Sequence, residues 1–317
     1  MLGVNLKFLT WSFVVLSVNL TLNACKTRNS IGSSQIKVIG GHTVETPGYM
    51  ASLVSMNGST IFCGGTFIAS DVVVTAAHCV IDHEQPFGVI PALKVNEKLG
   101  DARRIAVRHT TLHSQWYANS PNHDYDIALL FLQPYQVSEF RTITPIELNQ
   151  ANDFPQLDTT LSVLGFGLTS KEFNAEQSRT LQSVDVNPIP NEICAKQNGY
   201  ANKVNARQLC AGDLIHGGKD ACFGDSGGPL VADNGSGLKL VGVTSWGRNC
   251  GAPKNPGIYT RISSFAGWIN AMRPFIEKSY PKPDLTITIK NYRPNADRSN
   301  FGELRIDNFT NVTGQYH

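Results

Sequence analysis

Residues 220–229, Asp-Ala-Cys-Phe-Gly-Asp-Ser-Gly-Gly-Pro, place one serine between an acidic residue and two glycines. Attack by a hydroxyl on a carbonyl needs an exposed oxygen and nearby backbone N–H groups that stabilise a developing oxyanion. The glycines around Ser226 let a substrate approach the backbone, because they carry no Cβ. Turns of this composition are common, so the interpretation depends on whether the chain also supplies a base and an orienting acid.

Two other segments supply those groups. His78 ends the run Thr-Ala-Ala-His that follows a predicted strand, and Asp126 directly precedes an apolar run at residues 127–131. A histidine with a pKa near ~6.5 is suited to accept the serine proton at neutral pH. Asp124 is the alternative to Asp126, but only Asp126 leads directly into the apolar run. The remaining histidines lack such a context and are interpreted as surface or structural residues: His42, His83, His109, His113, His123, His216 and His317.

The composition and the first residues indicate an exported globular protein. The 317 residues suffice for one large domain or two small ones, and 27 basic against 25 acidic residues leave a formal net charge of +2. Because no basic stripe accompanies that small charge, electrostatic capture of nucleic acid is not expected. Residues 1–24 resemble an export signal, with Lys7 ahead of an apolar stretch that is too short and too polar in places for a membrane span. We therefore expect a secreted protein.

The cysteines support export and leave one residue over. Seven cysteines in an exported chain suggest three disulfides and one unpaired residue. Cys25 stands alone ahead of the domain, and residues 22–25 resemble a bacterial lipoprotein cleavage site in which the cysteine is lipidated, although Asn23 departs from that pattern. The alternative is ordinary cleavage after Ala24. Residues 25–37 then form a polar linker, and membrane contact is expected only through a lipid on Cys25.

Short apolar runs separated by turn residues predict an all-β chain. The expected strands cover residues 51–54, 62–68, 72–75, 104–112, 126–131, 161–167, 182–186 and 240–246. A long irregular segment is expected between residues 81 and 104. One helix is predicted from near Ser264, where apolar residues recur at i, i+3, i+4 and i+7, and Pro274 should end or kink it. The apolar stripe consists of Phe265, Trp268, Ile269 and Met272.

Five segments, taken in order, resemble the trypsin/chymotrypsin-like serine proteases. They are Val-Ile-Gly-Gly at residues 38–41, the segments around His78 and Asp126, Gly-Asp-Ser-Gly-Gly-Pro at residues 224–229, and Ser-Trp-Gly at residues 245–247. The resemblance covers residues 38–278 and implies two antiparallel Greek-key β-barrels with a C-terminal helix and a site in the cleft between them. Phe166 stands where the family usually has tryptophan. Residues 279–317 are a C-terminal extension outside the family pattern, and their role is unknown.

The resemblance implies a role for each motif residue. Ser226 is the nucleophile, His78 the general base and then acid, and Asp126 the group that fixes the imidazole tautomer. The backbone N–H groups of Gly224 and Ser226 form the oxyanion hole. The activity implied is that of a serine endopeptidase that forms an acyl-enzyme. The cysteine pairs implied are Cys63–Cys79, Cys194–Cys210 and Cys222–Cys250.

The resemblance also implies the substrate preference. Asp220, six residues before Ser226, is at the base of the primary pocket, where a carboxylate selects Arg or Lys. Ala221 offers no hydroxyl to hold a lysine ammonium, so Arg should be preferred. The other pocket residues expected are Ser245, Trp246, Gly247 and Gly257. The partners expected are protein and peptide substrates with Arg or Lys at the cleaved bond, and protein protease inhibitors.

Activation is expected to require one cut. Cleavage after Lys37 would free the α-amino group of Val38, which in this family turns inward to pair with Asp225. Because Lys37 matches the predicted substrate preference, the enzyme could activate itself. If Cys25 is lipidated, the protein is anchored at the cell envelope until the same cut releases it.

Several expectations bound this interpretation. We expect no cofactor and no metal, since the loop after His78 is no convincing match to the calcium loop of the family, and we expect a monomer. A catalytically silent binding module on the same fold is the main alternative, and an adhesion lipoprotein that acts through its C-terminal extension is another. The sequence leaves open whether four glycosylation-type triplets are modified. They begin at Asn57, Asn234, Asn308 and Asn311.

Overall fold

The computed structural model describes residues 39–58, 60–81, 86–93, 97–116, 122–134, 143–168 and 177–279. The expected signal, Cys25, the linker, Lys37, Val38 and the C-terminal extension lie outside these residues, as do His83, His317, Asn308 and Asn311. The expectations for all of them therefore stay predictions. No helix among the described residues is both long and apolar enough to cross a membrane.

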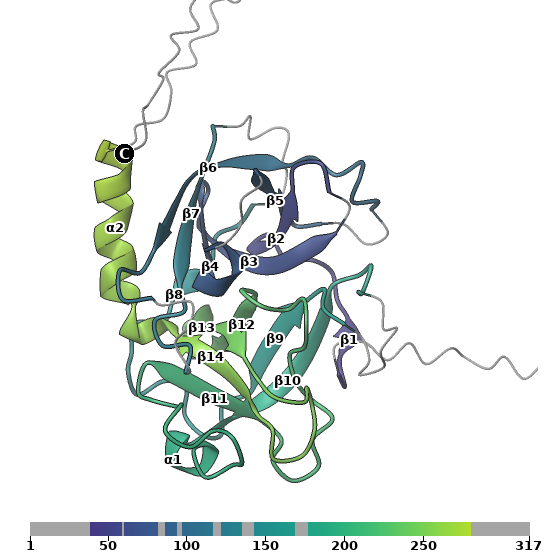
Figure 1. The fold of residues 1–317 in the computed structure, drawn as a ribbon, viewed down its shortest axis with the longest axis vertical. Helices are drawn as coiled ribbons and strands as arrows, with labels where there is room; N and C mark the ends of the chain where they lie inside the picture. Colours follow the sequence, from purple (N-terminus) through teal and green to yellow (C-terminus); the bar gives the residue numbers. More distant parts are fainter. Residues whose placement is uncertain are drawn as a thin grey trace, which may run out of the picture. The chain divides into compact units, whose positions relative to one another are not determined.

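The first half of the chain forms a closed barrel of six antiparallel strands (Figure 1). Its central strands β4 and β7 are short and apolar, and every residue of both is buried. In strands that are buried on both faces, apolar residues form a continuous run instead of alternating with polar ones. This pattern allowed both strands to be predicted from the sequence. In spatial order the strands are β2 (Met50–Ser55), β3 (Ile61–Ala69), β4 (Val72–Thr75), β7 (Ala128–Leu132), β6 (Ile105–Leu112) and β5 (Phe87–Pro91).

The second half forms another ring of six strands, closed by the antiparallel pairing of β9 with β10. Two short strands join this sheet from outside the ring: β1 (His42–Thr43) pairs with β10, and β8 (Glu147–Leu148) runs parallel to β13. In spatial order the ring strands are β10 (Gln182–Ile189), β11 (Gln208–Gly212), β14 (Gly257–Arg261), β13 (Leu238–Trp246), β12 (Pro229–Asp233) and β9 (Leu161–Gly165). The two barrels expected from the resemblance are confirmed.

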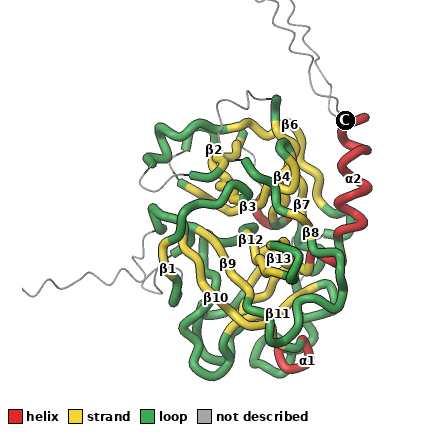
Figure 2. Tube along the Cα trace, turned by 180° about the vertical axis from the view of Figure 1, so that it is seen from behind, coloured by secondary structure: helices red, strands yellow, loops and turns green. Residues whose placement is uncertain are grey.

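Helical structure is sparse among the described residues (Figure 2). It comprises η1 (Ala77–Cys79), α1 (Asn191–Cys194), η3 (Ile262–Ser264) and α2 (Ala266–Ser279). Helix α2 follows the last strand of the second barrel but lies beside the first barrel (Figure 1). Its residues Ile269 and Ile276 belong to the core cluster that also contains the interior of the first barrel.

Helix α2 continues through Pro274, so the expected end of the helix at that residue is wrong, and the kink stays a prediction. Proline removes one helical hydrogen bond, at a cost of about 3 kcal/mol. Asn270, whose carbonyl loses that bond, is exposed, and water can therefore hydrate it. Beyond the proline, Ile276 is buried in the core, and this contact keeps the last turns helical.

The segment between residues 81 and 104 is less irregular than expected, because it contains strand β5. This strand pairs along its whole length with β2, from Ala51 opposite Pro91 to Ser55 opposite Phe87. Pro91 lies at the end of the strand, where its missing N–H interrupts no ladder. Pro86 and Pro91, which make the segment resemble a loop, lie just before the strand and at its end, so they limit only the length of β5. The short strands β1, β8, β11, β12 and β14 were also not predicted, and the strands that were predicted are found within a few residues of their expected limits.

Candidate active site

His78 and Asp126 meet where the first barrel faces the second. His78 lies in η1, directly after β4, and its Nδ1 is 2.7 Å from Asp126 Oδ2. The backbone N–H of His78 also donates to Asp126 Oδ1 at 2.9 Å, so this carboxylate holds both the ring and the main chain. Burial opposes protonation of the ring, but the hydrogen bond and the charge of Asp126 outweigh it, and the pKa of His78 lies above its ordinary value.

Asp126 is buried completely and is held by side chains from the second barrel as well. Ser245 Oγ in β13 donates to Asp126 Oδ2 at 2.5 Å, and Thr260 Oγ1 in β14 donates to the Asp126 carbonyl at 2.8 Å. Asp124 is instead paired with Arg207, whose Nε donates to it at 2.8 Å. Of the two aspartates that the sequence leaves as alternatives, the one in contact with His78 is Asp126.

Ser226 lies in the tight turn that enters β12, and this turn packs against the segment that leads to His78. The turn is possible because Gly227 has a left-handed backbone, with φ +76. A Cβ on Gly227 would lie 2.2 Å from Thr75 Oγ1 and 3.2 Å from Ala76 N. Only glycine therefore lets the two segments approach this closely, and the Ser226 carbonyl accepts a 2.7 Å hydrogen bond from Gly64 N of the first barrel.

The turn that holds Ser226 lies against residues 75 and 76, just before His78, but the two reactive side chains are not joined by a hydrogen bond. In the part of the chain that the structure describes, Ser226 Oγ and the His78 ring form none. Such bonds are often long in the absence of substrate and shorten when it binds. The backbone N–H groups of Gly224 and Ser226 likewise donate to no described carbonyl, which leaves both of them for a ligand.

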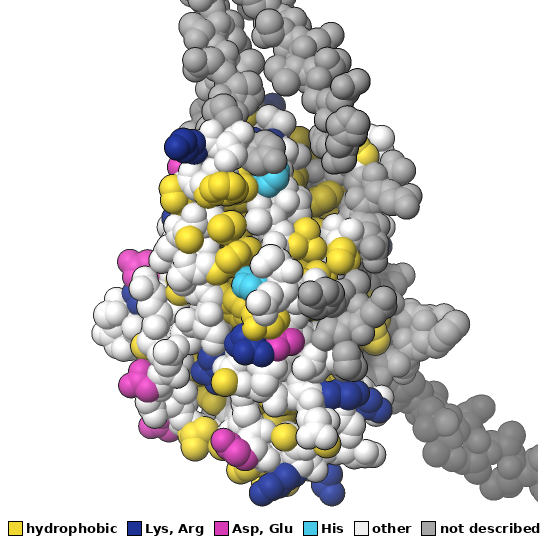
Figure 3. Space-filling view, turned by 60° about the vertical axis from the view of Figure 1, so that its left-hand side comes forward, with side chains coloured by type: hydrophobic (Ala, Val, Ile, Leu, Met, Phe, Trp, Pro, Cys, Tyr) yellow, Lys and Arg dark blue, Asp and Glu magenta, His cyan; other side chains and the backbone are white. Residues whose placement is uncertain are grey.

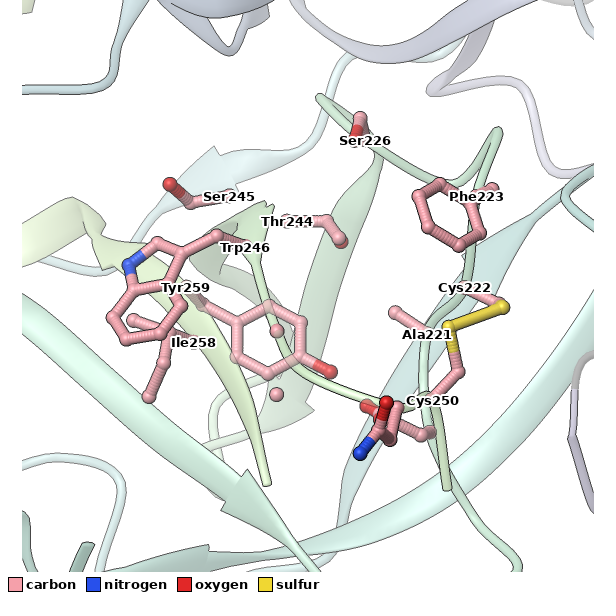
Figure 4. Close-up of a pocket in the computed structure, with 14 residues that line it drawn as sticks. Ala221, Cys222, Phe223, Ser226, Thr244, Ser245, Trp246, Cys250, Ile258 and Tyr259 are labelled. Carbon is pink, nitrogen blue, oxygen red and sulfur yellow. A yellow bond between two sulfur atoms is a disulfide. The ribbon is translucent and has the colours of Figure 1, made fainter. Parts of the chain in front are cut away.

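A cavity of about 220 Å³ opens beside Ser226 (Figure 4). Asp220, which is 2% exposed, lines it, and its Oδ2 accepts a hydrogen bond from Gly251 N at 2.8 Å. Trp246 and Phe223 lie on opposite sides of the cavity, and Phe223 is 75% exposed. The lining includes every residue that the sequence assigns to substrate binding: Asp220, Ala221, Ser245, Trp246, Gly247 and Gly257.

The comparison with known families agrees with this geometry. The family model described as Trypsin matches residues 38–269, which is most of the chain. The chain belongs to the trypsin family of serine proteases. Both barrels and all the residues described above lie within the matched range or next to it.

Several proteins of this family are similar to the chain over most of its length. Kallikrein-14 of Homo sapiens is 35% identical over 237 residues, which cover 74% of this chain and 83% of the relative. Vitellin-degrading protease of Bombyx mori is 34% identical over 267 residues, 83% of this chain and 94% of the relative. Transmembrane protease serine 11E of Mus musculus is 36% identical over 263 residues, 80% of this chain, but the match spans only 59% of the mouse protein. These relatives support a hydrolase that acts on proteins.

The three disulfides that the resemblance implies are all present. They are Cys63–Cys79, Cys194–Cys210 and Cys222–Cys250. The first joins β3 to η1 beside His78. The third ties the segment before Ser226 to the opposite wall of the cavity, so two of the three disulfides hold parts of the site of this trypsin-family protein.

Asp225, next to Ser226, occupies a fully buried cradle made by the second barrel. Its Oδ1 accepts a hydrogen bond from Gly167 N at 2.7 Å, and its Oδ2 accepts one from Cys222 N at 2.8 Å. A Cβ on Gly165 or Gly167 would collide with the carboxyl group, so the two glycines around Phe166 make room for it. Burial raises the pKa of Asp225 to about 6, although the two N–H groups oppose the rise.

His123 lies beside His78, which the sequence did not indicate. The two rings meet edge to face, with centroids 6.1 Å apart and planes 89° apart. Trp116 and Trp246 contact His123 at ring distances of 6.0 and 6.2 Å. The pKa of His123 lies below its ordinary value, because burial favours the neutral ring. The packing among aromatic rings is compatible with the expected structural role, and the three-residue spacing to Asp126 was the signal that could have placed His123 near the site.

An aromatic cluster fixes the segment that presents Asp126. Tyr125, with φ +59, stacks on His113 at 4.7 Å, and the Arg207 guanidinium lies 4.5 Å from the Tyr125 ring centroid. His113 also contacts Trp268 of α2 at 5.0 Å. These contacts pack the segment before Asp126 against both α2 and the second barrel. On the face turned forward in Figure 3, apolar side chains gather with histidine and charged side chains among them.

Proposed function

We propose that the protein is a secreted serine endopeptidase that is made as an inactive precursor and cleaves after Arg, and less readily after Lys. The observation that carries this proposal is the contact of His78 Nδ1 with the buried Asp126 at 2.7 Å, beside the turn that holds Ser226. A histidine oriented by a buried carboxylate next to an exposed hydroxyl is the arrangement needed to activate that hydroxyl.

In the proposed reaction, His78 Nε2 removes the proton of Ser226 Oγ as the oxygen attacks the carbonyl carbon of the scissile bond. The N–H groups of Gly224 and Ser226 stabilise the oxyanion, and each such donor contributes about 2.7–4 kcal/mol to the transition state. The protonated His78 gives its proton to the leaving amine. A water molecule then attacks the acyl-enzyme through the same base, which restores Ser226.

Asp126 keeps Nδ1 of His78 protonated, so that Nε2 is the basic nitrogen. The donated bonds from Ser245 and from the His78 main chain hold the carboxylate in one orientation. Since the pKa of His78 lies above its ordinary value, the ring is protonated and inactive as a base at low pH. The value of kcat/KM should rise with pH through that elevated pKa.

Asp220 supports the preference for a basic side chain. A carboxylate that lines a cavity next to the nucleophile favours a cationic side chain of the substrate, because opposite charges attract more strongly in a partly enclosed site than in water. A guanidinium can donate two parallel hydrogen bonds to a carboxylate, which an ammonium cannot. Ala221 adds no hydroxyl that would compensate for a lysine ammonium, and this favours Arg.

The cradle of Asp225 supports activation by cleavage. Its carboxyl is buried, and no basic side chain pairs with it among the described residues. The α-amino group of Val38, freed by a cut after Lys37, would supply the missing charge. Ile39 already lies against this region, because its carbonyl accepts a hydrogen bond from Asp220 N at 3.3 Å. If Cys25 carries a lipid, the same cut releases the enzyme from its anchor.

The test is the hydrolysis of matched arginyl and lysyl reporter peptides by the full chain cut after Lys37. We expect turnover, a higher kcat/KM for the arginyl peptide, and no turnover in Ser226→Ala. The variant Lys37→Gln, which cannot be cut at this bond, should stay inactive. Absence of turnover in a protein whose N-terminus is confirmed as Val38 would contradict the enzymatic proposal and favour a silent binding module.

A further inference from the structure

We propose that Asn234 is a site of spontaneous deamidation, in which its side chain forms a cyclic imide with the backbone nitrogen of Gly235 and releases ammonia. Water then opens the ring to an aspartyl or isoaspartyl residue. Asn234 lies in the turn that joins β12 to β13, outside the residues assigned to catalysis and substrate binding. The proposal therefore does not rest on the proposed function.

The sequence by itself does not single out this asparagine. The chain contains three Asn-Gly pairs, at residues 57–58, 198–199 and 234–235. Asparagine is a thermolabile residue, and a following glycine leaves the backbone nitrogen accessible because it carries no Cβ. Residues 57–59 and 234–236 are the same triplet, Asn-Gly-Ser. A difference between them must come from the structure around each pair.

A carboxylate lies next to the nitrogen that attacks. Gly235 N must lose its proton as it bonds to Asn234 Cγ, and its N–H donates to Asp233 Oδ1 at 2.8 Å. Asp233 is therefore placed to accept that proton as a general base. The turn has room for the ring, since a Cβ on Gly235 would meet no described atom within 4 Å outside its chain neighbours. All three residues are exposed, so water reaches the ring that forms.

Two donors face the oxygen that becomes anionic. Attack at Cγ moves negative charge onto Asn234 Oδ1, which accepts hydrogen bonds from Ser236 Oγ at 2.8 Å and from Ser236 N at 3.1 Å. Donors aimed at a developing oxyanion are the arrangement that lowers the barrier in acyl transfer. Asn234 Nδ2 makes no hydrogen bond to another described residue, so no such bond holds the leaving nitrogen back.

The reaction balances with water as the only co-reactant. The bond between Gly235 N and Asn234 Cγ forms first, and the proton of Gly235 N passes to Asp233. The bond between Cγ and Nδ2 then breaks, and Nδ2 leaves as ammonia with the proton that Asp233 returns through water. Addition of water to one of the ring carbonyls opens the imide and leaves a carboxyl group. The protein thus loses one amide and gains one negative charge.

The other two pairs lack this arrangement among the described residues. Gly58 N donates to the backbone carbonyl of Ser55 at 3.0 Å, and a neutral carbonyl accepts a proton far less readily than a carboxylate does. Gly199 lies under Arg248, whose Cζ is 2.8 Å from the position of a Cβ on that glycine, so the guanidinium fills the space beside it. Asn234 should therefore react faster than the asparagine of either pair.

The test follows deamidation in the full, unglycosylated chain with Ser226→Ala, which cannot digest itself. After incubation at neutral pH, peptide mapping by mass spectrometry gives the rate at each pair, because deamidation replaces NH₂ by OH. The rate at Asn234 relative to Asn57 should be at least about tenfold higher in the folded protein than in the urea-unfolded chain, where no folded structure distinguishes the two triplets. An equal or smaller ratio in the folded protein would overturn the proposal. The measurement does not depend on peptidase activity, so failure of the proposed function would leave its result unchanged.

Two variants separate the base from the oxyanion donors. Asp233→Ala removes the carboxylate and should slow deamidation of Asn234 at least about tenfold, less than the 10²–10⁴-fold that a base in an active site contributes. Ser236→Ala removes Oγ but keeps the backbone donor, and should slow it about two- to tenfold, as the loss of one hydrogen bond does. The matched control is Asp185→Ala, which removes an exposed carboxylate on β10 and should leave the rate unchanged. A rate that stays the same or rises in Asp233→Ala would mean that the hydrogen bond only restrains the attacking nitrogen, and would overturn the proposal.

Discussion

Two buried aspartates lie on either side of the nucleophilic turn, and they are held in different ways. Asp126 accepts hydrogen bonds from a histidine ring, from a backbone N–H and from the Ser245 hydroxyl, with donors from both barrels. Asp225 accepts only two backbone N–H groups, both from the second barrel. Both carboxyls are inaccessible to water.

The difference lies in the cationic group that can pair with each carboxylate. Asp126 has an ionisable partner in place, because His78 becomes a cation when it accepts a proton. Asp225 has no basic partner among the described residues, and its pKa of about 6 shows how burial penalises its ionised form. The first aspartate has its partner within the described residues, whereas in the proposed activation the second would gain a cationic partner only from the α-amino group of Val38. Substitutions at these residues and their neighbours test this difference between the two aspartates.

The largest effect is expected for Asp126→Asn. The amide keeps the shape of the side chain but favours the wrong tautomer of His78, so kcat should fall about 10⁴-fold at neutral pH. The measurement is steady-state hydrolysis of an arginyl peptide by the cut protein. Circular dichroism should show an unchanged fold. A loss of less than tenfold would mean that Asp126 is not the partner of the base.

Asp220→Ala tests a third buried carboxylate, which faces the cavity. Removal of one partner of a buried ion pair costs about 3–5 kcal/mol, so kcat/KM for the arginyl peptide should fall about 10²–10⁴-fold. The matched control is Asp213→Ala, which removes a half-buried aspartate of the same barrel that lies outside the cavity and contacts His216. Equal losses of kcat/KM in the two variants would contradict a role of Asp220 in substrate preference.

Asp225→Asn tests whether the buried Asp225 carboxyl, which has no basic partner among the described residues, makes the free energy of unfolding depend on pH. In the uncut chain the folded state holds the proton of Asp225 up to about pH 6, against an ordinary pKa of 3.8. The free energy of unfolding should therefore fall as pH rises from about 4 to about 6, by roughly 3 kcal/mol. Urea titrations of uncut Ser226→Ala should show this slope, and addition of Asp225→Asn should flatten it. An unchanged slope would assign the effect to other groups.

The smallest effect is expected for Ser245→Ala. This change removes one of the donors to Asp126 and leaves those from His78, and a hydrogen bond to a charged group contributes about 1.5–3 kcal/mol. We expect kcat to fall about tenfold or somewhat more, with little change in KM. Thr260→Val, which removes the bond to the Asp126 carbonyl rather than to its carboxylate, should have a weaker effect in the same assay. A larger loss of kcat in Thr260→Val than in Ser245→Ala would contradict the proposed role of the hydrogen bond from Ser245 to the Asp126 carboxylate.

Local patterns predicted the short strands, and the resemblance carried by the short motifs implied the two barrels and the roles of the motif residues. Buried strands such as β4 and β7 are continuous apolar runs, and Ser226, His78 and Asp126 each stand in a short distinctive segment. Asp220 lines the cavity, as the resemblance implied from its position six residues before Ser226.

What the sequence did not predict depends on contacts between distant segments. Strand β5 is defined by its pairing with β2 rather than by its own proline-flanked residues. Pro274 is tolerated because Ile276 is buried by other parts of the chain. His123 becomes a neighbour of His78 only through the left-handed turn before Asp126 and the packing of two tryptophans. None of these contacts leaves a local pattern.

Each end of the described chain attaches to the barrel formed by the other half. Strand β1 extends the sheet of the second barrel, and helix α2 lies beside the first (Figure 1). During synthesis the strands of the first barrel are finished at Leu132, but the helix that covers it is made only at the end of the domain. At about 5–20 residues per second the first barrel waits on the order of ten seconds with apolar surface uncovered. The nascent chain therefore leaves part of the first barrel's apolar surface without its cover until its last helix is made.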